Sequence, residues 1–199
     1  MTAQTPLEPG QYYHVFNRGN NREDIFAETR NYGFFLRLYA HHVDAIADTF
    51  AYCLLRNHFH LLIRIKSEQD LLDLASPPDP HHLPSRRFAN LFNAYARAFN
   101  QACDRTGALF QRPFRRVQVT SDAYFAQLVV YIHRNAQKHG FVRVFREWPH
   151  SSYHTLLTDQ PTRLKRETVL EWFGGPAALA AAHDVDITDP EIADLAPEA

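Results

Sequence analysis

The sequence has only two cysteines among its 199 residues, Cys53 and Cys103, and their separation supports neither a disulfide framework nor a zinc knuckle. No apolar run approaches the ~18 residues that a membrane-spanning helix needs. Residues 1–11 lack the basic-then-apolar order of a signal peptide. These absences predict a cytoplasmic globular protein that makes no contact with a membrane.

A positive net charge, usual for proteins that bind nucleic acids, is also missing, because the formal net charge is -1. The charge is nevertheless unevenly distributed along the chain. Residues 86–146 contain 11 Lys/Arg and 2 Asp/Glu, whereas residues 183–199 contain six acidic residues and no basic one. A basic block of this size indicates a polyanionic partner. We expect that removing residues 183–199 strengthens binding of that partner.

Hydrophobic patterning and turn signals predict an α+β fold. The order strand, helix, strand, strand, helix, strand is the βαββαβ arrangement of ferredoxin-like and RRM-like proteins, in which an antiparallel sheet leaves one face free for a site. A further helix follows the last strand, with Ser121 as its N-cap and Gly140 at its end. The predicted strands are 11–17, 49–55, 58–66 and 115–120, and the predicted helices are 31–47, 85–104, 121–138, 167–173 and 176–182.

Two histidines, His58 and His60, begin the third predicted strand. Because side chains alternate along a strand, both lie on one face, opposite the apolar set Phe59, Leu61, Ile63 and Ile65. Two imidazoles on one face can bind a single divalent cation. A pair of surface histidines on an amphipathic strand would give the same short pattern, so the pair alone leaves both interpretations open.

The helix predicted at 121–138 carries a polar stripe beside its apolar side. Tyr131 and Asn135 are four residues apart and therefore neighbours on that stripe, and Lys138 follows them. A tyrosine at the boundary of an amphipathic helix, with its ring half buried, is the alternative reading of this pattern.

Together, the strand and the helix supply the groups of a phosphodiester-cleaving site. Asn135 offers an oxygen as a third metal ligand beside His58 and His60, and this mixed set suits Mg²⁺ or Mn²⁺ better than zinc. A tyrosine beside such a cation can attack a phosphate that the metal polarises. Since a phenol has a pKa of ~10, Tyr131 needs local activation to act as the nucleophile.

The same residues lie in a longer pattern that resembles the HUH single-tyrosine transposases, which include small insertion-sequence transposases and REP-associated tyrosine transposases. The similarity spans about residues 11–157. Two positions depart from the family pattern, since Arg56 stands where proline is common and Ala136 follows Asn135 where proline is common. The matching stretches are YHVFNR (13–18), AYCLLRNHFHLLIRI (51–65), residues 88–100, LFQRPFRR (109–116), YIHRNAQKHGFV (131–142) and WPHSSY (148–153).

The resemblance implies a fold, a reaction and a site. His58 and His60 match the family's His-hydrophobic-His signature, Tyr131 its nucleophile and Asn135 the polar residue that completes the metal site. Such enzymes cut single-stranded DNA near hairpins, form a 5′-phosphotyrosine link and rejoin strands. A non-catalytic single-stranded nucleic-acid binding protein of the same fold and a replication-initiator-type nickase remain the alternatives.

On this reading, residues 1–157 form the transposase domain, and residues 158–199 form a short helical extension with an acidic tail. The protein is expected to bind single-stranded or hairpin DNA, as a monomer or as a homodimer in which the tyrosine helix serves either subunit. Tyr12, Tyr95 and Phe114 are candidates for stacking on bases. The basic residues expected to contact DNA are Arg18, Arg86, Arg87, Arg97, Arg112, Arg115, Arg116 and Lys138.

Overall fold

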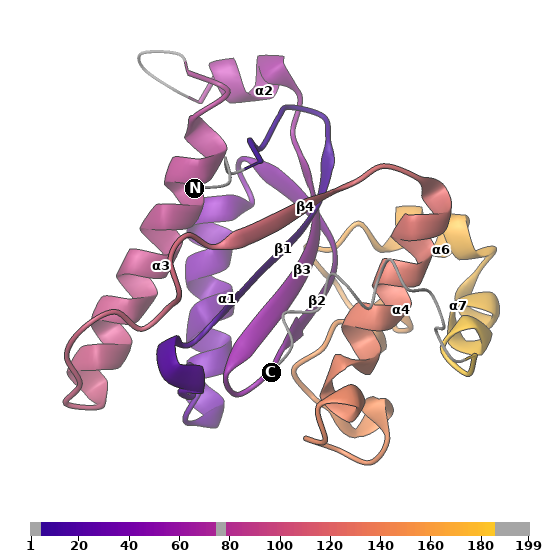
Figure 1. The fold of residues 1–199 in the computed structure, drawn as a ribbon. Helices are drawn as coiled ribbons and strands as arrows, with labels where there is room; N and C mark the ends of the chain where they lie inside the picture. Colours follow the sequence, from indigo (N-terminus) through magenta and orange to yellow (C-terminus); the bar gives the residue numbers. More distant parts are fainter. Residues whose placement is uncertain (1–4, 75–78, 186–199) are drawn as a thin grey trace.

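A computed structural model describes residues 5–74 and 79–185 of the chain. Four antiparallel strands form one sheet in the order β2-β3-β1-β4, with helices on both faces (Figure 1). This confirms the predicted α+β, ferredoxin-like arrangement. The strands are β1 (Tyr12–Arg18), β2 (Ala47–Leu54), β3 (His58–Ile65) and β4 (Arg115–Val119), and the α-helices are α1 (Thr29–Val43), α2 (Glu68–Leu72), α3 (Leu83–Ala102), α4 (Asp122–Lys138), α5 (Tyr153–Leu156), α6 (Arg166–Phe173) and α7 (Pro176–Ala182).

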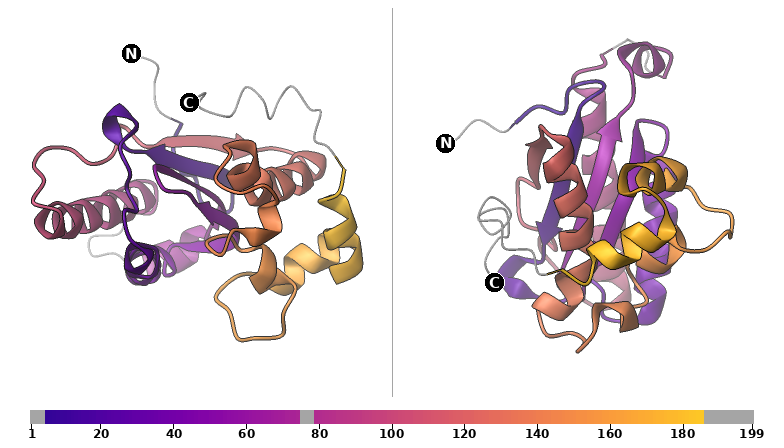
Figure 2. Two further views of the ribbon diagram at one scale, coloured as in Figure 1. Left: turned by 90° about the horizontal axis from the view of Figure 1, so that it is seen from below. Right: turned by 90° about the vertical axis from the view of Figure 1, so that its right-hand side faces the viewer.

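The sheet separates two hydrophobic clusters. Helices α1 and α3 cover one face, and α4, α6 and α7 lie on the other side (Figures 1 and 2). The alternation predicted for β3 is confirmed, because its four apolar residues at 59, 61, 63 and 65 all pack in the α1–α3 cluster. Leu62, with the opposite parity, packs in the α4 cluster. His58 and His60 share that parity, so they face α4.

Helix α4 follows the edge strand β4 and begins where the sequence predicts. The Ser121 side chain accepts a hydrogen bond from the Tyr124 backbone N–H at 3.2 Å, and Gly140 adopts a φ of 70° just beyond the helix. The helix is buried on more sides than its apolar stripe indicates, because residues 141–157 wrap around it. Val130 and His133, outside that stripe, are buried as well, and His133 contacts Ser152 and His183.

The described part of the extension packs against the same side of the sheet. The backbone N–H of Lys165 donates to the Thr49 carbonyl at 2.9 Å, and Trp172 lies against Phe125 with ring centroids 3.8 Å apart. Val169 and Leu179 are completely buried in the α4 cluster. The division into residues 1–157 and 158–199 stays a prediction, since these contacts do not set a boundary.

Other sequence expectations have mixed outcomes. Both cysteines are free, Cys53 buried and Cys103 exposed. Across residues 5–74 and 79–185, no helix is long and apolar enough to cross a membrane. Helix α3 begins at Leu83, before the predicted start at residue 85, and Pro84 lies in its first turn, where its missing N–H costs nothing. Residues 75–78 and the acidic tail from residue 186 lie outside the described residues.

Candidate active site

The two histidines of β3 lie beneath α4, as the strand alternation predicts. His58 is 8% exposed and His60 is completely buried. Their ring centroids are 5.2 Å apart, and the Tyr131 ring lies 5.6 Å from that of His60. Asn135 approaches His58, with its Oδ1 3.2 Å from the His58 Nε2. One chain therefore brings all four of these predicted residues together.

His58 lies between two amide oxygens. Its Nδ1 is 2.7 Å from Oδ1 of Asn57, and its Nε2 faces Oδ1 of Asn135. Burial, followed by the charge of His139, lowers the pKa of His58 to about 3, so the ring is neutral at pH 7. A neutral imidazole has one N–H and can donate to only one of the two oxygens. If the ring donates its single N–H to Asn57, the lone pair of Nε2 faces the Asn135 oxygen, which is also a hydrogen-bond acceptor. A cation between these two atoms could bind both.

His60 has a comparable second partner. Its Nδ1 lies 2.8 Å from the Nε2 of His14, a fully buried residue of β1. The buried Nε2 of His60 has no hydrogen-bond partner within the part of the chain that the structure describes. Burial holds the pKa of His60 well below its usual value, so this ring is also neutral. When His60 donates from Nδ1 to His14, the Nε2 lone pair is free for a metal ion.

Tyr131 and Asn135 occupy successive turns of α4 and are 5% and 0% exposed. Burial raises the pKa of the Tyr131 hydroxyl, and the nearby Asn135 side chain partly opposes this rise. The phenol is therefore protonated at rest. Neither its hydroxyl nor Nδ2 of Asn135 has a hydrogen bond of normal geometry to any described residue. The Nζ of Lys138 lies 5.0 Å from the centre of the Tyr131 ring, where it can favour negative charge.

The donor set fits a hard divalent cation better than zinc. Among the described residues, no three His, Cys, Asp or Glu side chains form a group that could hold a metal. A third ligand beside His58 and His60 would therefore be the oxygen of Asn135. The unpartnered Nε2 of His60 is unusual in a protein interior, where most buried polar groups are satisfied. This lone pair is the atom that a bound cation would use. The unpartnered Nδ2 of Asn135 is an N–H donor and could bind an anionic oxygen instead.

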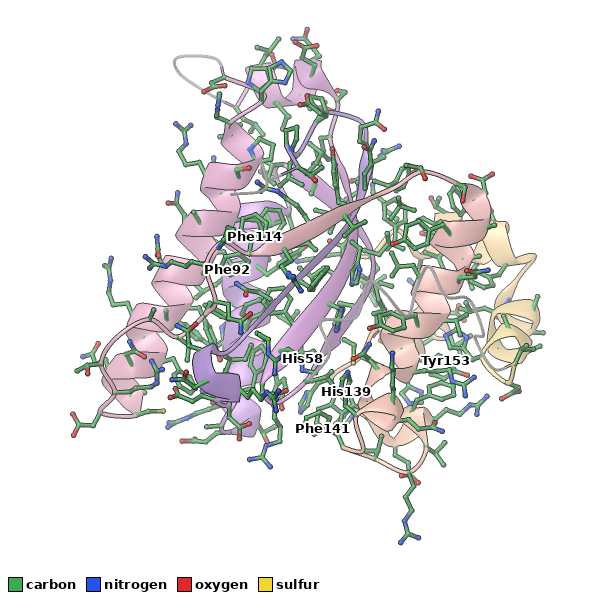
Figure 3. All side chains as sticks on the ribbon, in the orientation of Figure 1. His58, Phe92, Phe114, His139, Phe141 and Tyr153 are labelled. Carbon is green, nitrogen blue, oxygen red and sulfur yellow. The ribbon has the colours of Figure 1, made fainter. Side chains whose placement is uncertain are left out.

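Sequence reasoning missed His14 and His139. His14 faces the site because β1 pairs with β3, which places Phe16 opposite His60 and His14 two residues along. His139 follows α4, and its ring centroid lies 4.7 Å from that of His58 (Figure 3). The parity of β1 could have indicated His14, since the strand alternates around Tyr13 and Val15, which face the other cluster.

The predicted basic contacts divide into two groups. Arg18 and Lys138 are near the site, since the charges of both depress the pKa of His139 after the larger effect of burial. Arg115 lies over the Phe16 ring at 5.9 Å, on the same sheet face. The other five are on the α3 side of the sheet. They are Arg86 and Arg87 at the start of α3, Arg97 further along it, Arg112 in the following loop, and Arg116, which donates to Ser85 Oγ at 3.1 Å.

The three residues predicted to stack on bases differ in how accessible the structure leaves them. Tyr95 is wrong as a candidate, because it is completely buried and its hydroxyl donates to the Ile25 carbonyl. Tyr12 packs among Phe50, Phe125 and Trp172. Phe114 is half-buried beside α3. Helical periodicity placed Tyr95 on an apolar side without showing how completely that side is covered.

Comparison with known proteins gives a match in sequence and matches in structure. No family model matches the chain. A Haemophilus influenzae protein provisionally named a REP-associated tyrosine transposase is 27% identical over 147 residues, which is 69% of this chain and 73% of that protein. A solved structure of a REP-associated tyrosine transposase bound to a REP hairpin superposes with a TM-score of 0.58 at 19% identity, covering 81% of this chain and 88% of the other. The motifs, the sequence match and the shared fold agree in what this chain is similar to, which is the REP-associated tyrosine transposases of the HUH type.

Proposed function

We propose that this protein is a metal-dependent transposase or endonuclease that cuts and rejoins single-stranded DNA through a 5′-phosphotyrosine intermediate. The observation that carries the proposal is the convergence of the Tyr131 hydroxyl, the Asn135 amide and two neutral histidines at one buried place. A relative of the same fold was solved bound to a REP hairpin. The proposed substrate is accordingly a DNA end that carries a hairpin, and the proposed setting is the cytoplasm.

In the proposed reaction, Tyr131 loses its proton and its phenolate oxygen attacks a backbone phosphorus. The new P–O bond joins Tyr131 to the 5′-phosphate, and the bond to the 3′ oxygen breaks. That oxygen leaves and takes a proton to become a 3′-hydroxyl. Its later attack on the phosphotyrosine reverses the step and rejoins DNA without hydrolysis.

The residues around Tyr131 have separate tasks in this proposal. Lys138 lies over the phenol ring and favours the charged phenolate, whose formation burial opposes. Arg18 supplies positive charge for the DNA backbone. His58, His60 and Asn135 would hold Mg²⁺ or Mn²⁺, which when bound would polarise the phosphate. Because Tyr131 and His60 of one chain are adjacent, the proposed reaction uses the tyrosine of the same subunit.

The test is adduct formation by the purified full-length protein on a labelled hairpin oligonucleotide with single-stranded flanks. With Mg²⁺ or Mn²⁺, the wild type is expected to yield a covalent protein–DNA band that survives denaturing electrophoresis. Tyr131→Phe removes only the hydroxyl and should abolish the band, while EDTA should abolish it for the wild type. Tyr124→Phe, on the same helix, is the matched control and should retain the band.

Two outcomes would contradict the proposal. An adduct of equal yield from Tyr131→Phe would place the nucleophile elsewhere. Salt-sensitive binding of the hairpin with no adduct under any metal condition would favour the non-catalytic binding protein.

A further inference from the structure

A short 3₁₀ helix, η1 (Asn20–Arg22), follows β1 at the end of the sheet where β3 begins (Figure 1). Its last residue, Arg22, has a φ of 62°, and Asn21 before it has a φ of 53°. Both angles lie in the left-handed region, which asparagine tolerates and which arginine enters only at a cost in stability. Strain of this kind at a charged residue indicates a functional constraint.

The contacts around η1 hold this strained backbone in place. The backbone N–H of Asn20 donates to the Leu109 carbonyl at 2.9 Å, and its side-chain Nδ2 donates to the Ala108 carbonyl at 2.8 Å. Gly19 packs so closely that a Cβ at this position would lie 2.1 Å from the carbonyl oxygen of Glu23. The turn is therefore a fixed part of the fold, and it fixes the backbone from which the arginine side chain extends.

The turn adjoins the candidate active site. The backbone N–H of Gly19 donates to the Asn57 carbonyl at 2.8 Å, and the side-chain Oδ1 of Asn57 lies 2.7 Å from His58 Nδ1. Arg18, directly before the turn, is paired with His58 in the sheet. Burial, followed by the charge of Arg22, lowers the pKa of Arg18, so the two guanidinium groups act on each other. Arg22 thus adds positive charge at the edge of the proposed metal site.

The charge of Arg22 is exposed and has no acidic partner in its surroundings. Glu23, the next residue, pairs with Arg105, and Asp24 pairs with Arg56. Within residues 5–74 and 79–185, no ion pair involves Arg22. A guanidinium group binds a phosphate through two parallel hydrogen bonds, so a phosphate is the ligand that this side chain suits best.

We propose that Arg22 binds the DNA phosphate next to the one that Tyr131 attacks, and that the strained turn is retained because it positions this arginine. The turn leads outward from Arg18 and His58, so the phosphate that Arg22 reaches is a neighbour of the scissile phosphate. The inference rests on the proposed function only in taking a DNA strand at this site as the ligand. It adds a substrate-positioning residue that the sequence did not indicate.

The experiment measures DNA binding by fluorescence anisotropy without divalent ions, at about 50 and 200 mM salt, and stability by urea unfolding. The probes are a hairpin with single-stranded flanks and the blunt hairpin. Arg22→Gly removes the charge and the strain together, whereas Arg22→Lys retains the charge. Asn21→Gly relaxes the neighbouring left-handed residue without a change of charge. Arg37→Ala removes an exposed arginine from α1 and controls for net charge.

Arg22→Gly should bind the flanked hairpin about fivefold more weakly at the lower salt concentration. The slope of log K against log salt should become shallower by about 0.7 to 1, because one phosphate contact is lost. The urea midpoint of the same variant should rise by about 0.3 M as the strain is relieved. Weaker binding together with higher stability is a combination that damage to the fold would not produce.

The other variants separate charge from shape. Arg22→Lys should show an intermediate loss, because a lysine retains the charge without the paired donors. Asn21→Gly and Arg37→Ala should bind the flanked hairpin within about twofold of the wild type. All variants should bind the blunt hairpin as the wild type does, since it lacks a strand to be cut.

Wild-type affinity of Arg22→Gly for the flanked hairpin at low salt would overturn the inference. An equal loss in Asn21→Gly would overturn it as well, because the shape of the turn would then be responsible. An equal loss for the blunt hairpin would assign Arg22 to the duplex stem instead. Because the assay needs neither metal nor cleavage, its result is independent of the adduct experiment, and failure of the proposed chemistry is distinguishable from failure of the role of Arg22.

Discussion

Two buried histidine clusters lie on opposite sides of α4 and differ in how completely their nitrogen atoms are bonded. The site cluster is His14, His58 and His60 with Asn135. The anchor cluster is His133, His183 and Ser152. Both are almost inaccessible to solvent, and burial lowers the pKa of each of the five histidines.

In the anchor cluster every ring nitrogen has a partner. His183 Nδ1 donates to the Leu179 carbonyl at 2.7 Å, so its Nε2 accepts from His133 Nδ1 at 2.8 Å. The remaining nitrogen of His133 then accepts from the Ser152 hydroxyl at 2.7 Å. Ser152 Oγ in turn accepts from the backbone N–H of Tyr52. This chain of hydrogen bonds holds α7 and the segment around Ser152 against α4.

The site cluster has the opposite character. Nδ1 of His14, Nε2 of His60 and Nδ2 of Asn135 all lack a partner among the described residues. Buried polar groups cost stability when unsatisfied, so such a cluster is retained where it receives something. Both clusters are buried and have lowered histidine pKa values, so the unpartnered nitrogen atoms distinguish the site cluster as a whole from the anchor cluster.

The largest effect should come from breaking the anchor cluster. His133→Leu leaves Ser152 and His183 buried without their shared partner, and should lower the free energy of unfolding by about 2–4 kcal/mol. Urea denaturation followed by circular dichroism measures this loss. His41→Ala, at an exposed position on α1, should change stability by less than about 0.5 kcal/mol. If the urea midpoint of unfolding of His133→Leu equalled that of the wild type, the anchor cluster would not stabilise the fold as proposed.

The second prediction concerns His14, which we expect to position the ring of His60. His14→Phe keeps an aromatic ring but removes the acceptor for His60 Nδ1. Loss of such a supporting contact typically lowers metal affinity by about 10- to 100-fold. Calorimetric titration with Mn²⁺ measures the affinity directly, without reference to activity. Wild-type affinity in His14→Phe would show that the His14–His60 contact does not orient the ligand.

Much of the site follows from local periodicity, and the missing parts are non-local. The alternation at residues 58–65 places both histidines on one face, and helical spacing places Tyr131 beside Asn135. The alternation of β1 gives the sheet face on which His14 lies, but its contact with His60 depends on the register between β1 and β3, which no local pattern encodes. The anchor cluster joins residues 133, 152 and 183. Predicting it would have required knowledge of how α7 packs, and α7 lies outside the family resemblance.

The third prediction sharpens the comparison through pH. Burial lowers the pKa of His183 to about 4, from 6.5 when exposed. Between these values the unfolded chain binds more protons than the folded chain, so stability falls as the pH falls from 6.5 toward 4. One histidine contributes at most about 1.4 kcal/mol per pH unit. His183→Leu, followed by urea unfolding from pH 7 to 4, should show a shallower decline; a decline as steep as that of the wild type would contradict this.

The smallest effect concerns the acidic tail, whose boundary the anchor cluster corrects. The sequence predicts that removing residues 183–199 strengthens DNA binding, but His183 is 1% exposed and Asp184 pairs with Arg146 at 2.6 Å. Cutting before His183 would therefore dismantle the anchor cluster and confuse charge with stability. Removing only residues 186–199 takes away five acidic and no basic residues.

This shorter truncation should strengthen hairpin binding by about threefold at low ionic strength, because the tail's charge no longer opposes the DNA backbone. The gain should disappear near 0.5 M salt, where charges more than ~5 Å apart are screened. Anisotropy titrations at both salt concentrations measure it, with unfolding in urea as the check that the anchor cluster is intact. Equal affinity at low salt would show that the tail's charge does not act on the DNA-binding surface. Tighter binding that persisted at high salt would instead indicate that the tail physically covers that surface.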